Sequence, residues 1–120
     1  MSKSKVYVAE SESGKIVGFS TGGKERSGKY NDFTGELYAI YILEEYQGQG
    51  IGRKLIKPVI EDLIESDISS MLVLVLEQNN SRYFYEAIGG KPIDLLEVVI
   101  AGQKLKELVY GWDDIRLLSI

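Results

Sequence analysis

Cysteine and histidine are both absent from this chain of 120 residues. Without them the chain can form no disulfide, and it has no thiol nucleophile, no Ser-His-Asp triad and no zinc site built from His and Cys. We therefore expect no metal centre. Any acid or base in a reaction must be an Asp, Glu, Tyr, Lys or Arg side chain, or a bound water.

Long apolar runs and an excess of positive charge are also lacking. No apolar stretch approaches the ~18 residues of a membrane-spanning helix, and no apolar segment of a signal peptide follows the first residues. We therefore predict a cytoplasmic protein with no membrane partner. The formal net charge of -4 argues against a nucleic-acid partner, because proteins that bind nucleic acids are usually basic. It is compatible with a cationic acceptor such as an amine.

The composition present is that of a folded protein. With 44% hydrophobic and 27% charged residues, the chain can build one packed core, so we predict a single domain over residues 1–120. Residues 22–32 are polar and rich in glycine, which predicts a mobile loop. The hydrophobic pattern predicts strands at 5–9, 16–19, 36–43, 71–76, 93–100 and 104–110, and helices at 51–66 and 81–88.

The order of these elements predicts the fold class. Strand 36–43, helix 51–66 and strand 71–76 form one βαβ unit, which should be parallel and right-handed. The flanking strand pairs should be antiparallel hairpins. The result is an α/β (mixed α+β) fold with a mixed, mostly antiparallel sheet, a central parallel βαβ unit and helices on its faces. Pro58 lies inside the first helix and predicts a kink there.

The glycine-rich segment at the start of helix 51–66 is the candidate ligand-binding site. It contains Gly48, Gly50 and Gly52, which let a ligand approach the backbone amides closely. The first amides of the following helix have no partner within the helix, so they favour a phosphate group, and Arg53 and Lys54 lie at the same end. Such a turn can equally be structural. It fits neither the P-loop nor the Rossmann spacing of glycines.

Two sequence motifs resemble those of the GNAT superfamily of N-acetyltransferases. The segment Gln47-Gly48-Gln49-Gly50-Ile51-Gly52 matches the family signature Gln/Arg-x-x-Gly-x-Gly/Ala. The segment Asn79-Asn80-Ser81-Arg82-Tyr83-Phe84-Tyr85-Glu86-Ala87-Ile88-Gly89-Gly90 resembles the family element Asn-x-Ser-Arg-x-Phe-Tyr-Glu-x-x-Gly-Gly. Residues 37–43 look like the family's splayed strand. The resemblance extends from about Lys5 to the C-terminus.

This resemblance implies a cofactor, acetyl-CoA, and a primary amine as acceptor. It implies that Tyr85 is the general acid that protonates the departing thiolate, and that Glu36 stands where some members carry the general base. It further implies contacts to the pantetheine arm from the backbone of Ile40 and Ile42 and from the side chain of Asn79. The pyrophosphate would be held by the amides of Gln47, Gly48, Gln49, Gly50, Ile51, Gly52 and Arg53.

Simpler interpretations of the same residues stay open. Tyr85 can be a half-buried helix aromatic, Glu36 a polar residue at a strand start, and Asn79 a helix cap; Phe84 is interpreted as a core residue. The protein as a whole can instead be a non-catalytic acyl-CoA-binding or regulatory module, or an ordinary nucleotide-binding domain.

The chain departs from typical family members at its start. It begins at what looks like the family's second strand, without the usual N-terminal strand and two helices. A short natural member, a start lost from this sequence and a partner subunit that completes the site are three explanations. The short core predicts an exposed strand edge and an apolar face, which favour a homodimer.

Overall fold

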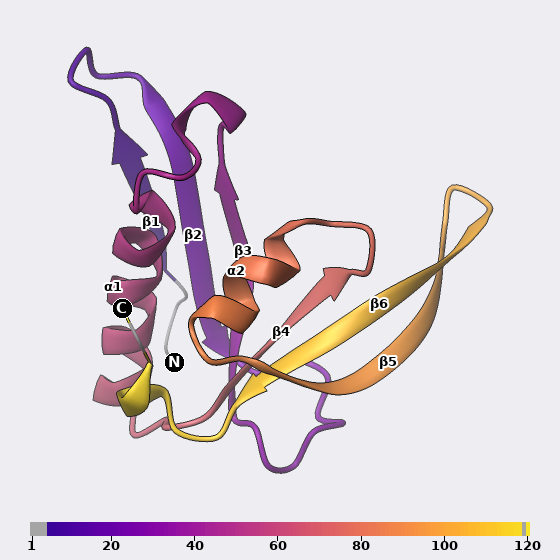
Figure 1. Ribbon diagram of the computed structural model, residues 1–120. Coiled ribbons are helices and arrows are strands. Elements are labelled where there is room, and N and C mark those ends of the chain that lie inside the picture. The colour runs from indigo at the N-terminus through magenta and orange to yellow at the C-terminus, as the bar shows by residue number, and fades with distance from the viewer. Residues whose placement is uncertain (1–4, 119) are drawn as a thin grey trace.

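The computed structural model describes residues 5–118 and residue 120. The strands form one six-stranded sheet in the order β1-β2-β3-β4-β6-β5 (Figure 1). The elements are β1 (Lys5–Glu10), β2 (Ile16–Lys24), β3 (Gly35–Ile42), the 3₁₀ turn η1 (Glu44–Tyr46), α1 (Ile51–Glu65), β4 (Met71–Leu76), α2 (Ser81–Ala87), β5 (Lys91–Ile100), β6 (Gln103–Trp112) and η2 (Ile115–Leu117).

β3 and β4 are parallel neighbours, but they pair only at their starts. Gly35 is opposite Met71 and Glu36 is opposite Leu72, after which the strands run apart (Figure 1). All other neighbouring strands pair antiparallel. The predicted mixed sheet with one parallel βαβ unit is therefore confirmed. From Leu37 onward, β3 presents one backbone edge that no strand of the sheet covers.

Small residues on β2 let α1 pack closely against the sheet. The Ser20 hydroxyl donates a hydrogen bond of 2.7 Å to the carbonyl oxygen of Leu55. A Cβ atom on Gly22 would lie 2.6 Å from Cγ1 of Val59, so any larger residue would push the helix away. The buried residues of α1 are Gly52, Leu55, Ile56, Val59, Ile60 and Leu63, and their helical spacing forms one apolar face.

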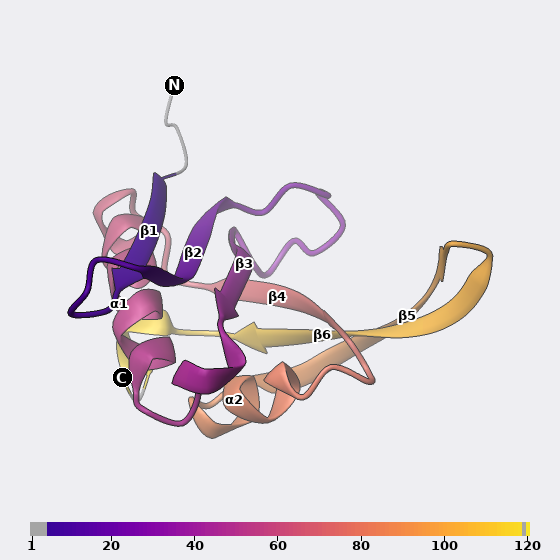
Figure 2. The same ribbon diagram turned by 90° about the horizontal axis from the view of Figure 1, so that it is seen from above.

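Both helices lie on the same face of the sheet (Figure 2). One core cluster contains Ile56 of α1 together with Tyr85 of α2. The opposite face carries a row of neighbouring apolar residues, Val8, Phe19 and Tyr41, which pair across β1, β2 and β3. Their exposed fractions are 50%, 37% and 55%. This part of the sheet is therefore packed on one side only.

The loop prediction for residues 22–32 was wrong at its start. β2 continues through Gly22 and Gly23 to Lys24 because both glycines pair with β3, and the loop occupies residues 25–34 instead. Glycine signals flexibility in a sequence, but at Gly22 it serves close packing. α1 runs through Pro58 without interruption. In the part of the chain that the structure describes, no helix has the length and apolarity needed to cross a membrane.

Candidate functional site

The candidate site is a cleft of about 700 Å³ between the end of β3, the glycine turn and the start of α2. Its position follows from the divergence of β3 and β4, which leaves room for a ligand beside β3. The lining residues are Ile40, Tyr41, Ile42, Glu44, Gln47, Gly48, Gly52, Gln78, Asn79, Asn80, Ser81 and Phe84.

The glycine turn leaves the start of α1 open to an anion. Gly48 and Gly50 have φ values of 76° and 82°, a left-handed conformation that favours glycine. Gly50 is the N-cap residue, so it contributes no side-chain cap, and the first turn of α1 contains no acidic residue. The first amides of the helix therefore face the positive end of the helix dipole without a competing carboxylate. These features suit a phosphate group.

Gly52 serves a different purpose from the other two glycines of the turn. It is buried in the first turn of α1, and a Cβ atom there would lie 3.1 Å from the Cε1 atom of Phe84. Phe84 also lines the cleft. Gly52 thus lets the α2 aromatic ring close one wall of the cleft, so the interpretation of Phe84 as a core residue was incomplete.

The free edge of β3 presents backbone groups to the cleft. The Leu43 amide donates to the Val17 carbonyl at 2.9 Å, so Leu43 faces β2. Alternation along the strand then turns the N–H and C=O groups of Ile42 and Ile40 toward the open edge. The Gln47 side chain donates a 3.0 Å hydrogen bond to the Ile42 carbonyl. An extended ligand beside β3 would therefore find both groups of Ile40 and the N–H of Ile42.

Asn79 joins the cleft to the start of α2. Its Oδ1 atom accepts a hydrogen bond of 2.9 Å from the amide of Ser81, which caps the helix start as the sequence suggested. Asn80 occupies the N-cap position but makes no side-chain capping bond. Because the oxygen of Asn79 is used by the helix, its NH₂ group is the part that can donate to a ligand.

The predicted binding residues divide into two sets. Ile40, Ile42, Gln47, Gly48, Gly52 and Asn79 line the cleft. Gln49, Gly50, Ile51 and Arg53 belong to the adjoining turn and the first turn of α1. Sequence reasoning gave no binding role to the other cleft-lining residues Tyr41, Glu44, Gln78, Asn80 and Ser81. Their positions in the sequence could have indicated them, because each lies in or within three residues of a motif or of the β3 edge.

Tyr85 lies behind this wall, in an aromatic cluster. It is 4% exposed, and its ring centroid lies 5.8 Å from Phe84, 6.3 Å from Tyr110 and 6.2 Å from Trp112. Burial raises the pKa of its hydroxyl to about 12. In the described residues, no hydrogen-bond partner for this hydroxyl occurs. Tyr85 is therefore a protonated donor at neutral pH, although it is not one of the residues that line the cleft.

Glu36 is the buried carboxylate nearest the point where β3 and β4 part. Its side chain is 7% exposed and forms a 2.9 Å ion pair with Nη2 of Arg26. The hydrogen bond to Glu36 raises the pKa of the Arg26 guanidinium above its ordinary value. The sequence did not indicate Arg26, because its partner is ten residues away and the contact depends on how loop 25–34 folds.

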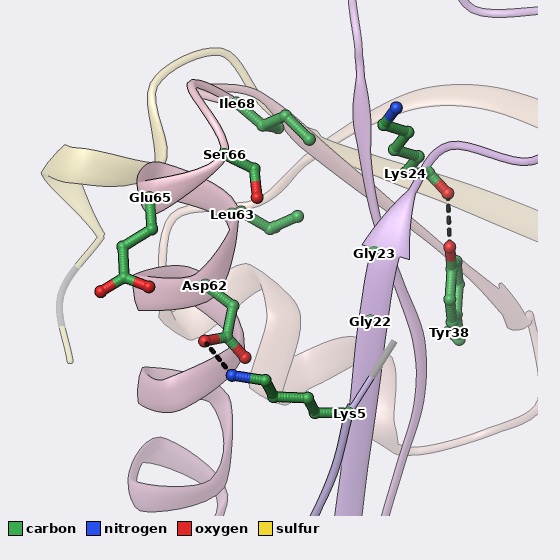
Figure 3. A pocket seen from close by; sticks show the side chains of 10 residues that line it. All are labelled: Lys5, Gly22, Gly23, Lys24, Tyr38, Asp62, Leu63, Glu65, Ser66 and Ile68. Atoms are coloured by element: carbon green, nitrogen blue, oxygen red, sulfur yellow. Dashed lines mark hydrogen bonds and ion pairs between the residues drawn. The ribbon is translucent and has the colours of Figure 1, made fainter. Parts of the chain in front are cut away.

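A second, smaller cleft of about 370 Å³ lies at the other end of α1. Figure 3 shows Asp62 reaching from α1 toward Lys5 of β1, with 3.8 Å between Nζ and Oδ1. Asp62 also accepts a hydrogen bond from Tyr7. The Asp62 carboxylate is thus engaged by two partners. Within residues 5–118 and 120, no three His, Cys, Asp or Glu side chains come together as a metal site.

A family model identifies the protein family to which this chain belongs. Residues 2–89 match the model of the acetyltransferase (GNAT) domain. The chain belongs to the GNAT acetyltransferase family. The match spans both helices, the diverging strands and the glycine turn. All residues that line the cleft therefore lie within the part of the chain that matches the family.

Similar proteins support the same assignment. The uncharacterized N-acetyltransferase YuaI of Bacillus subtilis is 44% identical over 114 residues, which are 95% of this chain and 65% of that protein. The [ribosomal protein bS18]-alanine N-acetyltransferase of Haemophilus influenzae is 37% identical over 59 residues, covering 49% of this chain and 40% of its own. The GNAT chain thus spans less than two thirds of the length of these relatives.

A solved structure resembles the fold. The protein yncA from Salmonella typhimurium, determined with its cofactor acetyl-CoA, superposes with a TM-score of 0.73 at 25% identity. The match covers 89% of this chain and 62% of that protein.

Proposed function

We propose that this GNAT chain transfers the acetyl group of acetyl-CoA to a primary amine. The observation that carries the proposal is the combination of an uncapped helix start and a free strand edge in one cleft. The helix start suits a diphosphate, and the strand edge suits an extended arm that carries amide groups. Coenzyme A contains both parts, joined end to end.

The geometry supports a role for each group of predicted binding residues. The amides of Gln47 through Arg53 hold the pyrophosphate. Ile40 and Ile42 pair with the pantetheine arm as an added strand would, and Asn79 donates to it from α2. The acetyl-CoA structure of the similar protein yncA supports the choice of ligand.

The chemistry falls to the few acids and bases that the chain contains. Acetyl-CoA supplies an activated acetyl thioester. Glu36, directly or through water, takes the proton that the ammonium group of the acceptor must lose. Tyr85 gives its proton to sulfur as the carbon–sulfur bond breaks and the carbon–nitrogen bond forms, and the second proton that the nitrogen loses restores the Tyr85 hydroxyl. The products are an N-acetylated amine, a free thiol and one proton released to solvent. Proximity of the two reactants supplies much of the rate.

The relatives also support an amine as the acceptor. The Haemophilus influenzae protein is named for an alanine of ribosomal protein bS18. A protein from Bos taurus, 38% identical over 58 residues, is named a thialysine N-epsilon-acetyltransferase. Both names describe transfer to a nitrogen atom, in keeping with a primary amine as the acceptor. The cytoplasmic location predicted from the sequence stays a prediction.

Two measurements test the function. Acetyl-CoA and CoA should raise the melting temperature whereas ATP should not, because only a ligand that binds the folded state stabilises it. Thiol release from acetyl-CoA should then appear with at least one member of a panel of primary amines. Binding without thiol release would favour the non-catalytic acyl-CoA-binding module, and stabilisation by ATP alone would favour a nucleotide-binding domain.

The uncovered sheet face supports a homodimer. The row formed by Val8, Phe19 and Tyr41 is a contiguous apolar surface of the kind that marks association. We expect a mass near 27 kDa in light scattering, twice the 13.4 kDa of one chain. Phe19→Lys should shift it to the monomer. Val99→Lys, at a 67% exposed position near the tip of the β5–β6 hairpin, is the control and should leave it unchanged. A wild-type monomer at all concentrations would contradict this proposal.

A further inference from the structure

Loop 25–34 places a positive charge on the buried carboxylate of β3. The Arg26 amide donates to Oε1 of Glu36 at 3.1 Å, and Nη2 of Arg26 donates to Oε2 at 2.9 Å. The Arg26 side chain is 62% exposed, whereas that of Glu36 is 7% exposed. Both carboxylate oxygens are thus covered by one residue that reaches in from the surface.

An aromatic ring completes the surroundings of this guanidinium. The Cζ atom of Arg26 lies 4.0 Å from the ring centroid of Tyr38, well within the range of a cation–π contact. The Tyr38 hydroxyl donates to the carbonyl of Lys24 at 2.6 Å, and Figure 3 shows this ring on the side of β2 away from α1. Gly23 makes room for it, since a Cβ atom there would lie 2.7 Å from the hydroxyl oxygen.

Glu36 and Tyr38 are also held by contacts that do not involve Arg26. Glu36 is held in β3 between β2 and β4, and Tyr38 is fixed by the β2 backbone. Arg26, by contrast, belongs to the loop. A buried carboxylate beside an aromatic face is a suitable site for a cation.

The cluster formed by Arg26, Glu36 and Tyr38 lies where the free edge of β3 begins. Glu36 pairs with Leu72 in the last pair before β3 and β4 diverge. The free edge begins at Leu37, one residue further along β3, and continues through Ile40 and Ile42. A ligand that follows this edge inward therefore ends close to Glu36.

We propose that Glu36 and Tyr38 form a cation subsite for the acceptor, which Arg26 fills in the free protein and from which the acceptor's primary ammonium group displaces it. This inference rests on the proposed acetyl transfer for its role, but the subsite is defined by its own contacts. Exchange of one cation for another keeps the buried carboxylate paired throughout, which avoids the large penalty of an unpaired buried charge. An amine can bind only those molecules in which Arg26 has left Glu36. The apparent affinity for amines is therefore the intrinsic affinity multiplied by the fraction of such molecules.

The test measures amine binding in the absence of acetyl-CoA. The probe is n-butylammonium, with n-butanol as an uncharged probe of nearly the same length. Binding is followed by the NMR chemical shifts of the backbone amides of residue 26 and Gly28. Arg26→Ala should bind n-butylammonium about 10-fold more tightly than the wild type, and n-butanol should not bind. Arg26→Met, which keeps a long side chain over Tyr38, should behave like Arg26→Ala.

Arg116→Ala is the matched control. Arg116 is 65% exposed and pairs with Asp114 at 2.8 Å, as Arg26 pairs with Glu36, but it lies on η2. Its removal should leave the affinity for n-butylammonium unchanged. Adding Glu36→Gln to Arg26→Ala should abolish binding. Unchanged or weaker binding in both Arg26 variants, or no binding in any variant, would overturn the subsite and leave Arg26 as a structural link of the loop.

A kinetic measurement separates this inference from the proposed function. If acetyl transfer occurs, Arg26→Ala should lower the KM for a primary amine about 10-fold with little change in kcat, because the variant changes access to the subsite. If no amine is acetylated, the acetyl-transfer proposal fails, whereas the NMR titration still reports on the subsite.

Discussion

Replacing Gly50 with aspartate is expected to weaken acetyl-CoA binding about 100-fold. The new carboxylate would stand at the N-cap of α1, beside the proposed diphosphate. At an effective dielectric constant near 20, two unit charges roughly 5 Å apart interact by about 3 kcal/mol, which corresponds to roughly 100-fold in affinity. Isothermal titration calorimetry with acetyl-CoA measures the change.

Gly50→Asn is the control for this prediction, because asparagine has nearly the same shape as aspartate and no charge. Both residues tolerate the left-handed conformation better than other side chains do, so both variants should lose a similar free energy of unfolding, about 1 kcal/mol. We expect less than about a 5-fold loss of affinity in Gly50→Asn, since only a small uncharged group is added. Equal affinities of the two variants would refute a diphosphate at this helix start.

Removing the hydroxyl of Tyr85 is expected to lower kcat by about 100- to 10,000-fold, the range in which a general acid contributes. The raised pKa of Tyr85, about 12, keeps its proton in place at neutral pH, as the proposed acid role requires. Because Tyr85 is not among the cleft-lining residues, Tyr85→Phe should change the affinity for acetyl-CoA by less than about 3-fold, within the noise of lost packing. Steady-state kinetics and calorimetry together separate the two effects.

Tyr110→Phe supplies the matched control, because it makes the same chemical change within the same aromatic cluster. Tyr110 is 1% exposed and donates its hydroxyl hydrogen bond to Glu86. Its replacement should lower the free energy of unfolding by about 1 kcal/mol and leave kcat nearly unchanged. If both variants lose the same activity, Tyr85 acts through packing and its role as an acid is wrong.

Features that depend on neighbouring residues in the chain were predictable, whereas features that depend on distant contacts were not. The glycine turn was predictable because Gly48 and Gly50 take left-handed φ values that their own backbone requires. β4 was predictable because a run of six apolar residues has few alternatives. The role of Gly52 was not, because it depends on Phe84, which lies 32 positions later in the chain and meets Gly52 only in the folded protein.

Tertiary structure alone decided which partners the candidate catalytic groups have. The sequence identified Glu36 and Tyr85 through the family resemblance, but not that Arg26 covers the first or that Phe84, Tyr110 and Trp112 surround the second. Periodicity also predicted two helices without indicating that both pack on one face of the sheet and leave Val8, Phe19 and Tyr41 exposed.

The amino-acid sequence by itself determined most of the elements, the glycine turn and the family, because turns, strands and helix starts are specified by residues close together in the chain. Only the folded molecule decided the shape of the cleft, the burial of the carboxylate and the cation upon it. Those features arise from side chains that are far apart in sequence, and their contacts depend on the packing of the whole sheet.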